Sequence, residues 1–335
     1  MDAVLSQIDL IESKSFHDIF RSVKPSKYDI GIDGALKHIE ETKMFYNILT
    51  EALTRDYEAI KEDFSTSSEL DRSNDASIKT ILGYILKFIE GICRLIDLFI
   101  KKIVGIFKKF TIRAKDVYLD NSRFLEKYGK KLHRIESATV EFFGYGMNNN
   151  LIMPSITTIM ASQSIYQDAK LIVLDGKKVF EDNDTVDEYI SKNRFLLLGD
   201  EHFISTTRII NDKDFQDAIK FKYYGAQKNL SYTVADALQT MSQYSGNVAN
   251  VKSWTEMIKN QGDADLRELK ILKNMAKNNL AYKDPTAVVK QLAMLTKYRT
   301  QAMNDQIYTF EVLMKYVDDS NLQSKSICIK ALMEN

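Results

Sequence analysis

The stretch from Ile78 to Lys115 decides the fold of this chain, and it reads IKTILGYILKFIEGICRLIDLFIKKIVGIFKKFTIRAK. Five charged residues recur in it at a spacing of three or four, which places them in one narrow stripe on a helix: Lys87, Glu90, Arg94, Asp97 and Lys101. Most of the other positions are Ile, Leu, Phe or Val, so in water this helix needs a cover from other helices, a partner chain or lipid. The residues expected under that cover are Ile85, Ile92, Ile96, Phe99, Ile103 and Phe107.

The composition is that of a folded helical protein without net charge. The chain has 335 residues, of which 44% are hydrophobic, and this suits one large domain or two ordinary ones. Lys and Arg number 46, and so do Asp and Glu, which argues against a general nucleic-acid binder. Only three prolines occur, and this favours long uninterrupted helices.

No segment reads as a targeting or membrane-spanning signal. The first residues, MDAVLSQIDLIESKSF, are amphipathic and acidic, so we expect no cleavable signal peptide. Charges interrupt every apolar run before it reaches the roughly 20 residues of a spanning helix. Cys93 and Cys328 lie far apart in apolar settings, which indicates reduced core residues rather than a disulfide.

The spacing of apolar residues predicts an all-α bundle of many helices in two subdomains, 1–143 and 151–335. The boundary is placed at 144–150 because the run FFGYGMNNN, which begins at Phe142, contains two glycines and three asparagines. Helices of the first subdomain are expected over three segments: 1–20, 35–64 and 78–115. The last of these can continue, bent near Thr111, into 115–142.

Capping and turn residues divide the second subdomain. An Asp-Gly pair lies between β-prone runs in LIVLDGKKVF, so we predict a β-hairpin at 171–180; the alternative is a helix with Gly176 at its C-cap. Helix starts are indicated by Thr185-x-x-Glu188, Ser253-x-x-Glu256 and Asp284-Pro285. The expected helices are 185–198, 213–223, 231–244, 252–281, 285–317 and 321–333.

No pattern of residues indicates catalysis, a cofactor or a metal. The chain has no P-loop, GxGxxG or GxSxG, and none of its four histidines lies in HExxH. Asp200, Glu201 and His202 are consecutive, and neighbouring side chains rarely point the same way. The acidic run 181–188 lacks the glycine and final glutamate of an EF-hand, so it is interpreted as a solvated loop with a helix cap. We therefore predict a non-enzymatic protein without a cofactor or metal.

Charge is distributed unevenly along the N-terminal half. Residues 51–75 are mainly acidic, and residues 101–134 are mainly basic. These segments can pair within the protein or lie on solvated faces; alternatively, the basic region meets phosphate, either of anionic lipid or of packaged nucleic acid. The candidate interaction residues are Lys101, Lys102, Lys108, Lys109, Arg113 and Lys115.

One part of the chain resembles a known class of protein. The Ile/Phe/Lys-rich helix from Ile85 to Phe110 runs into NSRFLEKYGKKL, residues 121–132, and this pairing over 78–132 is similar to a pattern in virion structural or internal proteins of large tailed bacteriophages. The resemblance implies a non-enzymatic protein of the virion, capsid-internal or at a connector, whose partners are other virion proteins or copies of itself. The alternative is a membrane-active protein whose 78–115 helix inserts into or lies on a bilayer.

Overall fold

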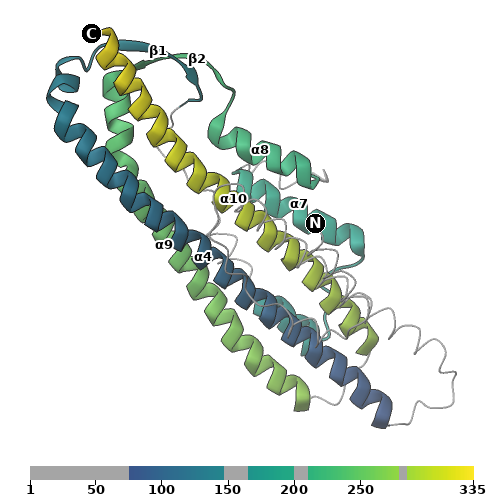
Figure 1. The fold of residues 1–335 in the computed structure, drawn as a ribbon. Coiled ribbons are helices and arrows are strands. Elements are labelled where there is room, and N and C mark those ends of the chain that lie inside the picture. Colours follow the sequence, from purple (N-terminus) through teal and green to yellow (C-terminus); the bar gives the residue numbers. More distant parts are fainter. Residues whose placement is uncertain (1–74, 147–164, 200–209, 279–284) are drawn as a thin grey trace, which may run out of the picture.

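The computed structural model describes residues 75–146, 165–199, 210–278 and 285–335, and this part of the chain confirms the all-α prediction (Figure 1). Its elements are six helices and one sheet of two strands. The three long helices are α4 (Asp75–Arg134), α9 (Val234–Asn278) and α10 (Pro285–Glu334). The other elements are α6 (Ile165–Val173), α7 (Asn183–Leu198), α8 (Asp212–Tyr224), β1 (Thr139–Gly144) and β2 (Lys228–Thr233).

The three long helices form an elongated bundle, and α10 is its central element (Figure 1). With 60, 45 and 50 residues, α4, α9 and α10 are about 90, 68 and 75 Å long at about 1.5 Å per residue. The helix α10 packs against α4 and α9, and also against α6, α7, α8 and β1. Most elements of the fold are therefore positioned through α10.

Several predicted helices are longer than their sequence patterns indicated. The helix that begins the described chain runs through Thr111 to Arg134 without interruption, and the hydroxyl of Thr111 donates a hydrogen bond to the carbonyl of Phe107. The predicted breaks near 245–251 and 318–320 are wrong, because α9 and α10 are each continuous there. A helix start at Ser253 is therefore also wrong. Buried Tyr244 and Val251 lie on one face of α9, and their packing outweighs the low helix propensity between them.

The apolar side of α4 is covered by α9 and α10. Five of the expected core residues are buried: Ile85, Ile92, Ile96, Phe99 and Ile103. The sixth, Phe107, is half-buried and packs against the core. Gly262 of α9 allows close approach, because a Cβ there would lie 2.6 Å from Cδ1 of Ile100. The helix predicted over 35–64 lies outside the described residues.

The main hydrophobic core contains residues on both sides of the predicted boundary at 144–150. A second, smaller core joins the end of α4 to the strands, the start of α9 and the end of α10. From residue 147 on, the boundary segment lies outside the described residues. The division into subdomains 1–143 and 151–335 stays a prediction.

A small β-ribbon replaces the end of the helix expected over 115–142. After α4 ends at Arg134, β1 pairs in antiparallel register with β2, with Val140 opposite Tyr232 and Phe142 opposite Leu230. Along both strands, residues turned toward the core alternate with exposed residues, as expected for a ribbon with one face on a core. The ribbon lies at the end of the bundle that holds the C-terminus (Figure 1).

The β-hairpin predicted at 171–180 is wrong, and the helix alternative is confirmed. The helix α6 continues to Val173, and the N–H of Lys177 donates to the carbonyl of Leu171 at 2.9 Å, which closes the C-terminal turn. Gly176 has a φ of 60°, where a residue without Cβ is favoured. The helix α7 has Asp182 rather than Thr185 as its N-cap. The carboxylate of Asp182 accepts a hydrogen bond from the N–H of Thr185.

Candidate interaction surface

The six candidate interaction residues all lie on α4, but they point in two directions. Lys101, Lys108 and Lys115 are spaced by seven residues and lie on the exposed outer face. Lys102, Lys109 and Arg113 lie on the flank toward α10. The structure therefore brings half of the candidate set together on the outer face, while Lys109 and Arg113 are exposed on the flank toward α10.

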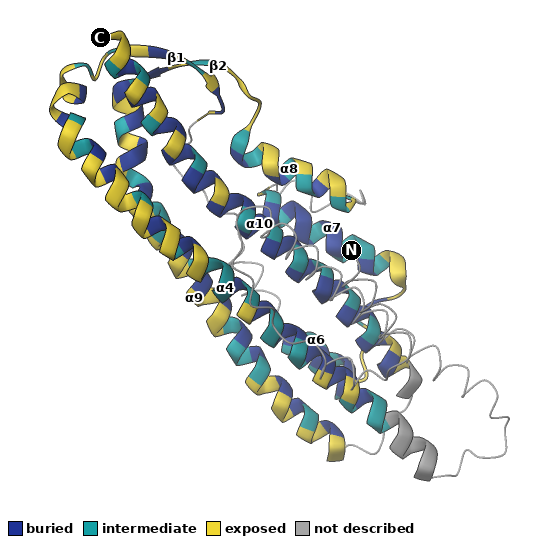
Figure 2. Ribbon diagram, viewed as in Figure 1, coloured by how far each residue is buried: buried dark blue, intermediate teal, exposed yellow. Residues whose placement is uncertain are grey.

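The outer face of α4 is exposed along much of the helix (Figure 2). In the sequence, cations and aliphatic residues alternate along this ridge. We define the α4 ridge as Lys101, Lys108, Ile112, Lys115, Leu119, Arg123, Glu126 and Lys130. Ile112 and Leu119 are 62% and 52% exposed. The sequence analysis placed Lys130 in the basic region without assigning it to the site, and it did not single out Arg123.

The cations of the α4 ridge differ in their partners. Lys101 pairs with Asp97 at 2.5 Å, between two exposed side chains of the same helix. In contrast, Lys108, Lys115, Arg123 and Lys130 are exposed and make no ion pair with any part of the chain that the structure describes. Their charges therefore face solvent.

The flank toward α10 is occupied by interactions within the protein. Arg113 Nε lies 3.1 Å from Oδ2 of Asp318, whose other oxygen accepts from the hydroxyl of Tyr244 at 2.8 Å. Burial raises the pKa of Glu311 on α10 to about 8, although the charges of Lys102 and Lys109 oppose the shift. One carboxylate oxygen of Glu311 is buried without a hydrogen-bond partner. This flank holds α4, α9 and α10 together.

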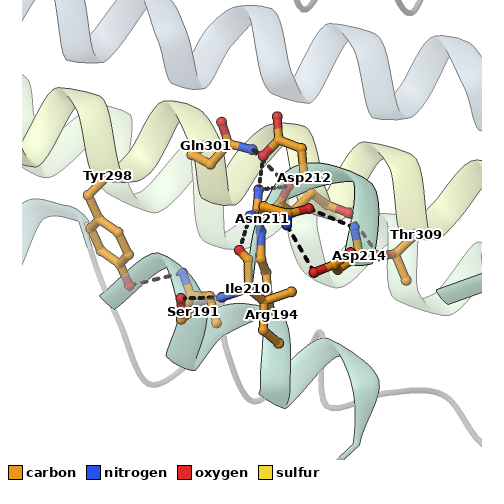
Figure 3. A network of polar contacts seen from close by, with 11 residues as sticks. Ser191, Arg194, Ile210, Asn211, Asp212, Asp214, Tyr298, Gln301 and Thr309 are labelled. Carbon is orange, nitrogen blue, oxygen red and sulfur yellow. Dashed lines mark hydrogen bonds and ion pairs between the residues drawn. The ribbon is translucent and has the colours of Figure 1, made fainter. Parts of the chain in front are cut away.

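An ion cluster, buried at Arg194 and Asp305, fixes α7 and the start of α8 to α10 (Figure 3). Arg194 donates from Nε to Oδ2 of Asp305 at 2.7 Å and from Nη2 to Oδ1 at 3.1 Å. It also donates from Nη1 to the carbonyl of Ile210 at 2.5 Å and from Nη2 to Asp212. Burial would lower the pKa of Arg194, but hydrogen bonds and charge from Asp305 and Asp212 raise it overall. The cluster is a structural clamp of three helices.

Two buried glutamines of α10 bind the backbone of segments that cross it. The side-chain oxygen of Gln291 accepts from the N–H groups of Val179 and Phe180, each at 2.8 Å, and its amide donates to the carbonyl of Phe180. Gln323 accepts from the N–H of Tyr145 at 3.3 Å and donates to its carbonyl at 2.8 Å. Both side chains therefore satisfy peptide groups that lack a neighbouring strand.

The buried titratable groups are used to pack the fold. Burial raises the pKa of Cys93 and of Cys328 to about 11, in keeping with their reading as protonated core thiols. Within the described ranges, no group of three or more His, Cys, Asp or Glu side chains could hold a metal ion. The Asp200-Glu201-His202 run lies outside those ranges.

The arrangement presents an exposed cationic face on an elongated helical bundle, whose helices are joined by buried polar contacts. Among the described helices, none has an apolar stretch long enough to cross a membrane. The chain matches no known protein family, no curated protein and no solved structure.

Proposed function

We propose that the protein is a non-enzymatic structural and interaction protein of a bacteriophage virion, capsid-internal or at a connector, that packs against other virion proteins or copies of itself. One observation carries the proposal: large apolar side chains recur at heptad spacing on the outer faces of the long helices. The resemblance of 78–132 to virion proteins adds the particle as the setting.

Two outer faces show this spacing. Leu322 and Ile329 are seven residues apart on α10. On α9, Met257 and Ile271 are fourteen apart, with Ala264 midway. All except Ala264 are exposed. A seven-residue repeat returns nearly to the same helix face, and it is the spacing by which helices pack against each other.

A rigid support strengthens the case for a structural role. The buried contacts of α10 reach α4 through Asn121 and Asn321, whose side chains lie 2.7 Å apart, and reach α6 through Arg299 and Asp168 at 2.6 Å. Such contacts at intervals along α10 keep long helices in a fixed register. An interaction protein benefits because its outer faces are then presented without a cost of ordering on binding.

The bilayer alternative is less well supported by this arrangement. It was motivated by the apolar surface of the 78–115 segment, and α9 and α10 cover Ile85, Ile92 and Ile96. Insertion would require α4 to leave these partners. We therefore retain contact with lipid only as an outcome to be tested.

The experiment is mass spectrometry of phage particles purified by density gradient from cells infected with the phage that encodes the chain. We expect peptides of the protein at a constant ratio to the major capsid protein across the particle peak. Abundant peptides in the infected-cell lysate, together with none in the particle peak, would refute the proposal. Removal of loosely bound proteins by a high-salt wash is the control for contamination.

A further inference from the structure

We propose that the cationic face formed by α4 and α9 binds the phosphodiester backbone of double-stranded nucleic acid without reading its sequence. The proposal deepens the proposed function, on which it rests for the packaged genome as the source of that nucleic acid. It requires solvent-facing cations, an extended layout and a local excess of cations over acids.

The first requirement is met on α4. Between residues 101 and 134 the sequence holds 11 Lys or Arg and three Asp or Glu, so the zero net charge of the chain hides a strongly basic helix. Lys108, Lys115, Arg123 and Lys130 are exposed and have no ion-pair partner among the described residues. On the α4 ridge itself, the acid is Glu126. A local excess of unpaired cations attracts a polyanion even when the whole chain is neutral.

The second helix widens this face. Lys273 of α9 pairs with Glu90 at 2.8 Å, and Gly262 lies against Ile100, so α9 runs antiparallel to α4. Lys259, Lys270 and Lys277 are exposed on α9, spaced by eleven and seven residues, and therefore share the side of α9 that Lys273 turns toward α4. The antiparallel register places Lys259 beside the stretch of α4 that contains Lys101 and Lys108. Lys270 lies near Cys93, before the α4 ridge begins, so Lys259 is the lysine of α9 that widens the ridge.

The layout suits a rod-like polyanion. From Lys108 to Lys130 the ridge extends about 33 Å at about 1.5 Å per residue, close to one turn of B-form DNA at roughly 34 Å. Duplex DNA carries about one negative charge per 1.7 Å of its axis, so several lysines can contact phosphates at once. Lysine ammonium groups on flexible stems act as point charges, which favours backbone contact over base recognition.

The same observations count against a membrane surface as the occupant. A helix that lies in a bilayer interface needs a continuous apolar face. On the α4 ridge only Ile112 and Leu119 are apolar, and Lys115 lies between them. Anionic lipid therefore enters as the rival outcome of the test.

The test measures the binding of the full chain to a short fluorescent duplex DNA of mixed sequence by anisotropy, over a series of salt concentrations. The ridge variant is Lys108→Glu with Lys115→Glu. The matched control is Lys213→Glu with Lys220→Glu, two exposed lysines of α8 at the same seven-residue spacing and with the same change of net charge. Melting temperatures establish whether both variants fold. If the ridge variant does not fold, Lys108→Gln with Lys115→Gln replaces it.

We expect the wild type to bind with a steep salt dependence. The ridge variant should bind at least about tenfold more weakly, with a log–log salt slope smaller by about two, because two phosphate contacts are lost. Equal losses in the two variants would overturn the proposal, since net charge alone would then explain them. Binding to phosphatidylserine vesicles but not to the duplex would also overturn it. If one of these two binding results were obtained while the protein was found in purified particles, the nucleic-acid inference would be refuted and the proposed function would stand.

Discussion

Arg194 and Asp305 are joined by two hydrogen bonds in the interior of the fold, at 2.7 and 3.1 Å, with each side chain at most 6% exposed. The pair links α7 to α10 across 111 residues of sequence. A buried ion pair is a modest source of net stability, but the loss of one partner leaves a charge in the interior without compensation. The clamp is therefore a point at which a single substitution has a large effect.

The first prediction concerns this clamp. Asp305→Ala should lower the free energy of unfolding by about 3–5 kcal/mol, because Arg194 stays charged and buried without its main partner. Asp116→Ala, at an exposed position of α4, should change it by no more than about 0.5 kcal/mol. Urea unfolding followed by circular dichroism measures both values, and a similar small effect of the two substitutions would show that the clamp is dispensable.

The second prediction uses two glycines of α9. A Cβ at Gly262 would lie 2.6 Å from Cδ1 and 2.9 Å from Cγ1 of Ile100, whereas a Cβ at Gly246 would meet no atom within 4 Å. Gly246→Ala should therefore stabilise the protein by up to about 1 kcal/mol through helix propensity. Gly262→Ala should destabilise it by about 1–3 kcal/mol, because overpacking outweighs the same gain. Equal shifts of the melting temperature in one direction would contradict the close approach of α9 to α4.

The regular part of the fold could be predicted from the sequence because it depends on local spacing. The apolar positions of α4 recur at three and four residues, and this periodicity identified the buried side correctly. The strands were missed because β1 and β2 are about 90 residues apart, and each is only six residues long. A weak strand signal was present, because apolar residues occupy every second position at Val140 and Phe142 and again at Leu230 and Tyr232.

The candidate surface was only partly predictable for a related reason. Sequence alone identified the basic stretch of α4, but it could not separate Lys108 from Lys109, since that depends on where α10 lies. Lys259 joins the surface through the antiparallel packing of α9 on α4, in which Lys273 pairs with Glu90 across 183 residues of sequence. Arg194 directly precedes the apolar run Phe195 to Leu198, which is a local sign of burial, but its partner Asp305 is identified only by the fold.

The third prediction tests the cover of α4 with two isoleucines of the same helix. Ile96 is 1% exposed and Ile112 is 62% exposed. Ile96→Asp should cost more than the about 2–5 kcal/mol of a truncation to alanine, because a charge enters the core without a partner. Ile112→Asp should leave the melting temperature almost unchanged. A melting temperature that is insensitive to Ile96→Asp would refute the packing of α4 against α9 and α10.

The last prediction concerns pH and Glu311. Burial raises the pKa of this carboxyl from 4.5 to about 8 in the folded protein, with Lys102 and Lys109 opposing the shift. The folded state therefore binds the proton more tightly than the unfolded state between these two values, and stability falls as pH rises through that window. The contribution of protonated Glu311 is complete below about pH 4.5 and is lost above about pH 8. Glu311→Gln keeps the shape of the neutral acid and cannot ionise, so its melting temperature should exceed that of the wild type by a margin that grows from pH 5 to pH 9.

Other carboxylates also titrate, so the comparison needs a second variant. Glu126→Gln removes an exposed carboxylate from the outer face of α4 and reports the effect of a changed net charge. The margin between Glu311→Gln and Glu126→Gln, measured by thermal unfolding across the pH series, isolates the α4–α10 interface. A constant margin, or one that shrinks toward pH 9, would mean that Glu311 is already ionised in the folded protein and that its charge is balanced by Lys102 and Lys109.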